Sequence, residues 1–159
     1  LNLYLKKIAL LNNYKVAVCL RSKNDFEEIE YYKKVLNGVD YVLVKSDKKK
    51  FSTFKTILKS NLTIGLNSTT LAEVFGIRKV LWVNILNNIN FEMPEAGISY
   101  FNQKNFIKFK NRVEYLIRMN INNYKKLVKR NADYICLKNN NKPAHKIIGD
   151  KIKEELNNV

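Results

Sequence analysis

The sequence contains little cysteine, histidine, glycine or proline. Its 159 residues include two cysteines, one histidine, five glycines and two prolines. Two cysteines cannot form a disulfide framework, and one histidine with two distant cysteines provides no metal-ligand set. His145 is the only histidine, and no Ser-His-Asp or Cys-His nucleophile can be assembled around it, so we expect it to cap or pack a helix. We therefore expect reduced thiols and no metal.

Several functional motifs are also missing. The chain has neither a Walker A loop nor a Gly-x-Gly-x-x-Gly fingerprint, so ATP hydrolysis and nicotinamide binding have little support. No stretch resembles the RNA-binding signatures of RRM or KH domains. No apolar run approaches the roughly 18 residues that cross a bilayer, and no signal peptide is visible. These absences favour a cytoplasmic globular protein.

Acidic residues are scarce relative to basic ones. The chain has 14 aspartates and glutamates against 29 lysines and arginines, a formal net charge of +15. Such a balance indicates partners that carry phosphate, or an anionic membrane surface. However, most of the basic residues are lysines, whereas proteins that read nucleic acids favour arginine. We expect no nucleic-acid partner, and the sequence leaves open whether the basic surface is merely solvated or has a target.

Apolar runs alternate with amphipathic segments along most of the chain. Short runs rich in β-branched residues predict strands, and apolar residues at helical spacing predict helices between them. The predicted strands cover residues 15–20, 40–44, 62–65, 79–85 and 98–101, and the predicted helices cover 1–12, 24–37, 51–58, 69–75, 104–119, 122–137 and 144–156. Strands that are apolar throughout indicate a parallel sheet covered on both faces.

This pattern predicts an α/β fold with a Rossmann-like, doubly wound parallel sheet and a C-terminal helical extension. We expect one domain over residues 1–137, followed by a linker and a last helix over 138–159. In doubly wound sheets, ligands bind outside the carboxyl ends of the strands.

One segment at such an end, LTIGLNSTTLAEVFG at residues 62–76, concentrates small polar residues. A predicted strand ends at Gly65, and a predicted helix begins after a run of amides and hydroxyls that comprises Asn67, Ser68, Thr69 and Thr70. Free N–H groups at a helix start, together with hydroxyl donors, suit a phosphate or diphosphate. The alternative is that these residues only cap the helix, because Thr70 and Glu73 have the spacing of a capping box.

The stretch GLNSTTLAEVFG, followed by IRKVLWVN, resembles the donor-binding C-terminal domain of GT-B glycosyltransferases. It is similar to the plant-type GWNSTLE box, with two extra residues before the glutamate. It is also similar to a turn of the non-hydrolysing UDP-sugar 2-epimerases, in which serine and glutamate are five residues apart, as Ser68 and Glu73 are here. With MPEAGI at residues 93–98 and KPAHKII at 142–148, it looks more closely like bacterial surface-polysaccharide biosynthesis proteins of this superfamily.

The resemblance implies a role for each matching residue. Ser68, Thr69 and Thr70 would contact the diphosphate, with Gly65 and Asn67 in the same turn, and Glu73 would bind the ribose hydroxyls. Arg21 follows the first strand and would add positive charge in the fork geometry that suits phosphate. Either Glu92 or Glu95 would face the donor sugar. For Arg21 and for these two glutamates, an ordinary surface position is the open alternative.

The function that the resemblance implies is transfer of a sugar from a nucleotide diphosphate sugar to an acceptor in surface polysaccharide biosynthesis. The nucleotide sugar is a substrate, and no cofactor is expected. Because the general base of GT-B enzymes usually belongs to the N-terminal domain, we expect this chain to be the donor-binding half, to work with its own N-terminal domain, and to be inactive alone. One alternative is an enzyme like the nucleotide-sugar 2-epimerases, although the acid and base residues it needs are not found.

A third possibility belongs to another class, a non-catalytic basic module that binds RNA or an anionic membrane. Lysine and arginine alternate with phenylalanine, isoleucine, leucine and tyrosine over residues 104–130. A basic amphipathic helix of this kind can lie on an anionic membrane, so peripheral contact with the inner face of the cell membrane is an expectation. The ordinary interpretation is a core stripe with a solvated face opposite it.

Overall fold

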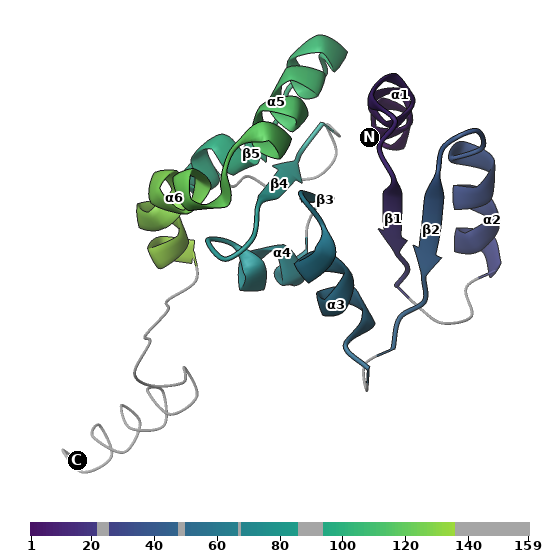
Figure 1. Ribbon diagram of the computed structural model, residues 1–159, viewed down its shortest axis with the longest axis horizontal. Coiled ribbons are helices and arrows are strands. Elements are labelled where there is room, and N and C mark those ends of the chain that lie inside the picture. The colour runs from purple at the N-terminus through teal and green to yellow at the C-terminus, as the bar shows by residue number, and fades with distance from the viewer. Residues whose placement is uncertain (22–25, 48–49, 67, 86–93, 136–159) are drawn as a thin grey trace.

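The computed structural model describes residues 1–21, 26–47, 50–66, 68–85 and 94–135. Helices and strands alternate along them, which confirms the α/β class (Figure 1). The helices are α1 (Asn2–Asn12), α2 (Phe26–Val35), α3 (Ser52–Lys59), α4 (Thr69–Val74), α5 (Phe106–Arg118) and α6 (Ile121–Ile135). The strands are β1 (Val16–Cys19), β2 (Tyr41–Val44), β3 (Thr63–Gly65), β4 (Val80–Val83) and β5 (Tyr100–Phe101), and a 3-10 helix, η1 (Pro94–Ser99), precedes β5. The predicted linker and last helix, residues 138–159, lie outside the described residues.

All strand pairs in the described chain are parallel, but the strands divide between two sheets rather than one. β1 pairs with β2, and β3, β4 and β5 form the second sheet in that order. A cavity of about 640 Å³ lies between them, lined by Ala17 and Val42 of the first sheet and by Leu62 and Ile64 near β3. The first sheet is covered incompletely, since Val42 stays 42% exposed.

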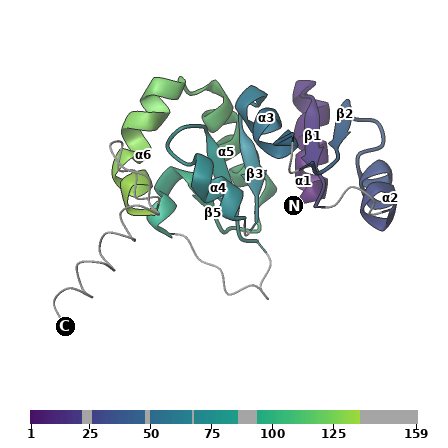
Figure 2. The ribbon, with the colours of Figure 1, turned by 90° about the horizontal axis from the view of Figure 1, so that it is seen from below.

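The main core surrounds β4, whose four residues are all buried. The ring of Trp82 packs edge-on against Phe75, with 5.1 Å between ring centroids. Phe109 of α5 and Val128 of α6 are buried in the same cluster. Full burial of one such side chain stabilises the fold by about 1.5–3 kcal/mol. The second sheet and the helices against it are therefore the stable platform, and Figure 2 shows α4, α5 and α6 around it.

Helix α6 is fixed to this platform through a buried hydroxyl. The Tyr124 hydroxyl lies 2.8 Å from the Ser99 hydroxyl and accepts the Val80 N–H at 3.2 Å. Tyr124 and Ser99 are both fully buried. Because buried polar groups are costly unless they are paired, this network selects one position of α6 against η1 and β4.

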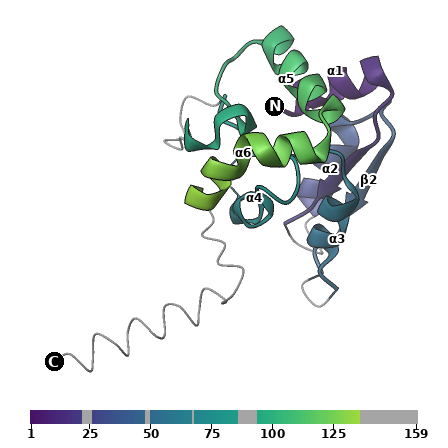
Figure 3. The ribbon, with the colours of Figure 1, turned by 60° about the vertical axis from the view of Figure 1, so that its left-hand side comes forward.

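Some of the basic residues have structural partners. The Lys79 ammonium donates to the carbonyls of Ile117 at 2.8 Å and Met119 at 3.0 Å, at the end of α5. Helix α5 also packs against α1 (Figure 3). The Arg78 guanidinium donates to carbonyls at the end of α3. Burial lowers the pKa of Lys79, and the nearby Arg78 charge lowers it further. Cations at helix C-termini satisfy free carbonyls, so the net charge of the chain is not by itself evidence of a partner.

Candidate functional site

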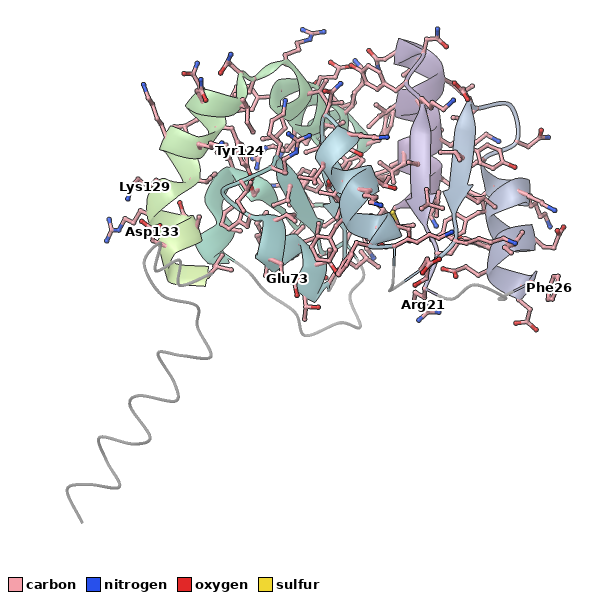
Figure 4. The ribbon with its side chains drawn as sticks, turned by 60° about the horizontal axis from the view of Figure 1, so that its bottom comes forward. Arg21, Phe26, Glu73, Tyr124, Lys129 and Asp133 are labelled. Carbon is pink, nitrogen blue, oxygen red and sulfur yellow. The ribbon has the colours of Figure 1, made fainter. Side chains whose placement is uncertain are left out.

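The predicted site residues that the structure describes gather where two strands end. β1 ends at Cys19, shortly before Arg21, and β3 ends at Gly65, four residues before α4 begins. Figure 4 shows Arg21 and Glu73 at the same edge of the molecule. This is the carboxyl edge of the parallel strands, where ligands of α/β folds bind. Arg21 follows the first sheet and Glu73 follows the second, so the candidate site spans both sheets.

The hydroxyl of Ser68 does not cap α4. Ser68 occupies the N-cap position with extended backbone (φ −140°, ψ 123°), but its side chain makes no capping hydrogen bond. Asn105 holds the same position on α5 with similar backbone (φ −131°, ψ 114°), and its side chain accepts the Lys108 N–H at 3.0 Å. The conformation of Ser68 therefore permits capping, yet its hydroxyl is left for another partner.

The predicted capping box is wrong. Helix α4 begins at Thr69, so Thr70 lies within the first turn and not at the N-cap. A capping box needs its glutamate three residues after the N-cap, and the residue three after Ser68 is the buried Leu71. The exposed carboxylate of Glu73 is consequently not explained by the start of its helix.

Gly65 has a structural explanation. A Cβ at this position would lie 3.0 Å from Cδ1 of Leu71, which is closer than side chains normally pack. Leu71 is 2% exposed and holds α4 against β3. The missing side chain at residue 65 thus lets α4 pack closely, and this does not require a ligand at the backbone.

The chemistry available at this edge is hydrogen bonding together with positive charge. Ser68 and Thr70 are half-buried, and Thr69 is exposed, so their hydroxyls can donate to phosphate oxygens. The carboxylate of Glu73 can accept from hydroxyls. Helix α4 has only six residues, so its dipole is weaker than that of a full-length helix. Positive charge at this edge would therefore come mainly from the exposed side chains that follow β1 and β2, Arg21 and Lys45.

Arg21 is held in place by its backbone, and its side chain is exposed. Its N–H donates to a carboxylate oxygen of Glu28 at 3.1 Å, which joins the end of β1 to α2. Phe26, which the sequence did not single out, is 77% exposed and lies beyond Arg21 on the same edge (Figure 4). Helical spacing could not have found it, because Phe26 lies three residues before the half-buried Ile29 and would be expected on the same face of α2.

Several predicted residues cannot be placed. Asn67, Glu92 and His145 lie outside the described residues. Glu95 lies in η1, but the position of its side chain is not among the described ones. The site that the structure brings together is therefore Gly65, Ser68, Thr69, Thr70 and Glu73, with Arg21 on the same edge.

Metal and thiol chemistry find no basis in the part of the chain that the structure describes. Within it, no group of three histidine, cysteine, aspartate or glutamate side chains could hold a metal ion. Burial raises the pKa of the Cys19 thiol, although hydrogen bonds with Thr56 and Thr53 oppose the rise. The thiol is thus protonated near neutral pH and a poor nucleophile. Among the described helices, none is long and apolar enough to cross a membrane.

Comparisons with known proteins add no relative. No protein-family model, curated protein or solved structure matches the chain. A functional proposal therefore rests on the geometry of the carboxyl edge and on the resemblance of the stretch GLNSTTLAEVFG to the GT-B donor-binding domain.

Proposed function

We propose that the chain is the nucleotide-sugar-binding half of a GT-B-type glycosyltransferase that acts in surface polysaccharide biosynthesis. Support comes from the residues at 65–73, which resemble the donor-binding turn of that superfamily in type. Their serine-to-glutamate spacing is that of the 2-epimerase turn, and the plant-type box has two fewer residues before its glutamate. The parallel α/β fold and the position of this turn at the carboxyl edge agree with the proposal.

The observation that carries the proposal is the unused hydroxyl at the N-cap of α4. Ser68 is in position to cap its helix, as Asn105 does on α5, but makes no such bond. A half-buried hydroxyl beside two threonine hydroxyls suits the oxygens of a diphosphate. Glu73, one helical turn further, would accept hydrogen bonds from ribose hydroxyls.

In the proposed mechanism, this chain stabilises the leaving nucleotide diphosphate. As the bond between sugar and diphosphate breaks, negative charge grows on the diphosphate oxygens. The hydroxyls of Ser68 and Thr69 would donate to these oxygens, and Arg21 would supply a positive charge. These interactions would stabilise the transition state more than the bound substrate. The acceptor site and the general base would belong to the partner N-terminal domain.

Equilibrium titration with UDP, CDP and the corresponding nucleosides tests this proposal. We expect the diphosphates to bind more tightly than the nucleosides, because most of the donors at the site suit phosphate oxygens. Arg21→Gln should weaken diphosphate binding about tenfold, the size of one charge-assisted hydrogen bond, and leave nucleoside binding unchanged.

The matched control is Arg130→Gln, which removes the same charge from an exposed position on α6. Equal losses in the two variants would mean that only net charge matters, which contradicts a diphosphate site at Arg21. Salt-dependent binding of single-stranded RNA, without any nucleotide binding, would favour the basic-module alternative instead.

A further inference from the structure

Helices α5 and α6 carry an excess of positive charge that is not compensated locally. Together they contain eight basic and two acidic residues, a net charge of +6. Both acids are already paired: Glu114 with Lys110 at 3.3 Å, and Asp133 with Lys129 at 2.9 Å. Exposed basic residues for which the described part of the chain records no acidic partner are Lys104, Lys108, Lys125, Lys126 and Arg130, whereas the Arg118 charge acts on Glu114 beside that of Lys110.

Large apolar side chains lie exposed among these cations. On α5, Ile107 is 67% exposed and Tyr115 is 53% exposed, and on α6, Leu127 is 55% exposed. The core stripes of both helices are separate from these positions, since Phe109 and Tyr124 are fully buried. The exposed apolar residues are therefore additional to the core face that an amphipathic helix needs.

One open groove between the two helices joins the apolar and basic residues into a single surface. It measures about 960 Å³ and is lined by Tyr115 and Arg118 from α5 and by Lys126 and Leu127 from α6. Figures 1 and 2 both place α6 at the end of the molecule opposite α2. We call this surface, defined by Tyr115, Arg118, Lys126 and Leu127, the α5–α6 face.

We propose that the α5–α6 face binds the surface of an anionic phospholipid bilayer. The exposed lysine and arginine side chains outnumber the acidic ones and are attracted to anionic headgroups, and the apolar side chains between them can enter the boundary of the acyl chains. Tyrosine suits this boundary because its ring is apolar and its hydroxyl group can stay hydrated. The proposal stands independently of the nucleotide-sugar site, which uses other residues.

A bilayer fits this face better than RNA. Single-stranded RNA is held by aromatic side chains on which bases stack, together with a basic groove. The α5–α6 face has one exposed aromatic ring, and its other exposed apolar residue, Leu127, is aliphatic. Aliphatic side chains have no role in base stacking but contribute directly to insertion into a bilayer.

Co-sedimentation of the chain with lipid vesicles tests the proposal. We expect binding to phosphatidylcholine vesicles that contain phosphatidylglycerol, little binding to phosphatidylcholine alone, and weaker binding as salt increases. Replacing both Arg118 and Lys126 by glutamine should lower the partition coefficient about 25-fold, since each cation near such a surface contributes about fivefold. Leu127→Ser should weaken the binding that remains at high salt.

The control variant replaces Lys34 and Lys55 by glutamine, which removes the same charge from exposed positions on α2 and α3. All these positions are exposed, so the substitutions should leave the urea midpoint nearly unchanged. Equal losses in the two double variants would overturn the proposal in favour of diffuse charge. Binding of the wild type to neutral vesicles that equals its binding to anionic vesicles would also overturn the proposal. So would an absence of vesicle binding together with RNA binding that is lost in the Arg118 and Lys126 variant.

Discussion

Replacing Ser68 by alanine separates a helix cap from a ligand-binding hydroxyl. At an N-cap where serine bonds to the helix, this change costs about 0.5–2 kcal/mol of stability. Ser68 makes no capping bond, so we expect a loss below about 0.5 kcal/mol, the usual size for a surface substitution. Asn105→Ala is the matched comparison, because Asn105 has similar backbone angles and accepts the Lys108 N–H at 3.0 Å. Its loss should be about 1 kcal/mol.

Urea unfolding at equilibrium measures both losses, and thermal unfolding provides a second readout. For a domain of this size, 1 kcal/mol lowers the melting temperature by about 2–4 °C. The Asn105 variant should therefore melt clearly below the wild type, and the Ser68 variant close to it. If Ser68→Ala destabilises the protein as much as Asn105→Ala does, the hydroxyl caps α4 after all, and the main support for a diphosphate site is lost.

Three further predictions concern the platform beneath the site. Tyr124→Phe should destabilise the protein by about 2–4 kcal/mol in urea unfolding, because it leaves the buried Ser99 hydroxyl and Val80 N–H unpaired. A loss below about 1 kcal/mol would show that the Tyr124 hydroxyl is not needed to pair these two groups. Burial raises the pKa of Tyr124 above its usual value of 10.0, so its contribution is complete below about pH 10 and is lost as pH rises through the folded pKa. The stability difference between wild type and Tyr124→Phe should accordingly shrink in alkaline urea titrations, and a constant difference would argue against the shift. Gly65→Ala should cost about 1–3 kcal/mol through overpacking against Leu71, and Leu71→Ala should relieve part of that cost when the two are combined.

The sequence predicted the order and type of the elements well where periodicity was strong. The apolar run at residues 79–85 contains β4, and its full burial follows from its position between two other strands. The helix predicted over residues 69–75 is followed by Gly76, and the φ of 75° at this position shows why glycine is suited to the residue after the C-cap of α4. These features depend on local sequence, so local reasoning was sufficient.

Features that depend on packing across the molecule were not predictable in the same way. The strand predicted at residues 98–101 is reduced to Tyr100–Phe101, because Ser99 belongs to η1 and pairs with Tyr124 of a distant helix. The separation of the strands into two sheets likewise depends on how β1 and β3 lie about a shared cavity.

The start of α4 shows the same limit within the candidate site. The helix predicted over residues 69–75 does begin at Thr69, but the capping-box spacing of Thr70 and Glu73 does not mark its N-cap, which is Ser68. Close packing of Leu71 on Gly65 accompanies this start of the helix. The grouping of Arg21 with Glu73 on one edge was predictable, because it follows from the general position of ligands in parallel α/β folds.

The dissociation constant of UDP for the wild type, Glu73→Ala and Asp40→Ala tests the central claim most directly. Asp40 is an exposed carboxylate that precedes β2, at the amino edge of the strands, so it controls for loss of one negative charge. The proposed ribose contact predicts that Glu73→Ala weakens UDP binding about 10- to 100-fold by isothermal titration calorimetry, the value of a hydrogen bond to a charged group, while Asp40→Ala changes it less than about twofold. Unchanged affinity in Glu73→Ala, or no UDP binding by the wild type, would contradict the claim.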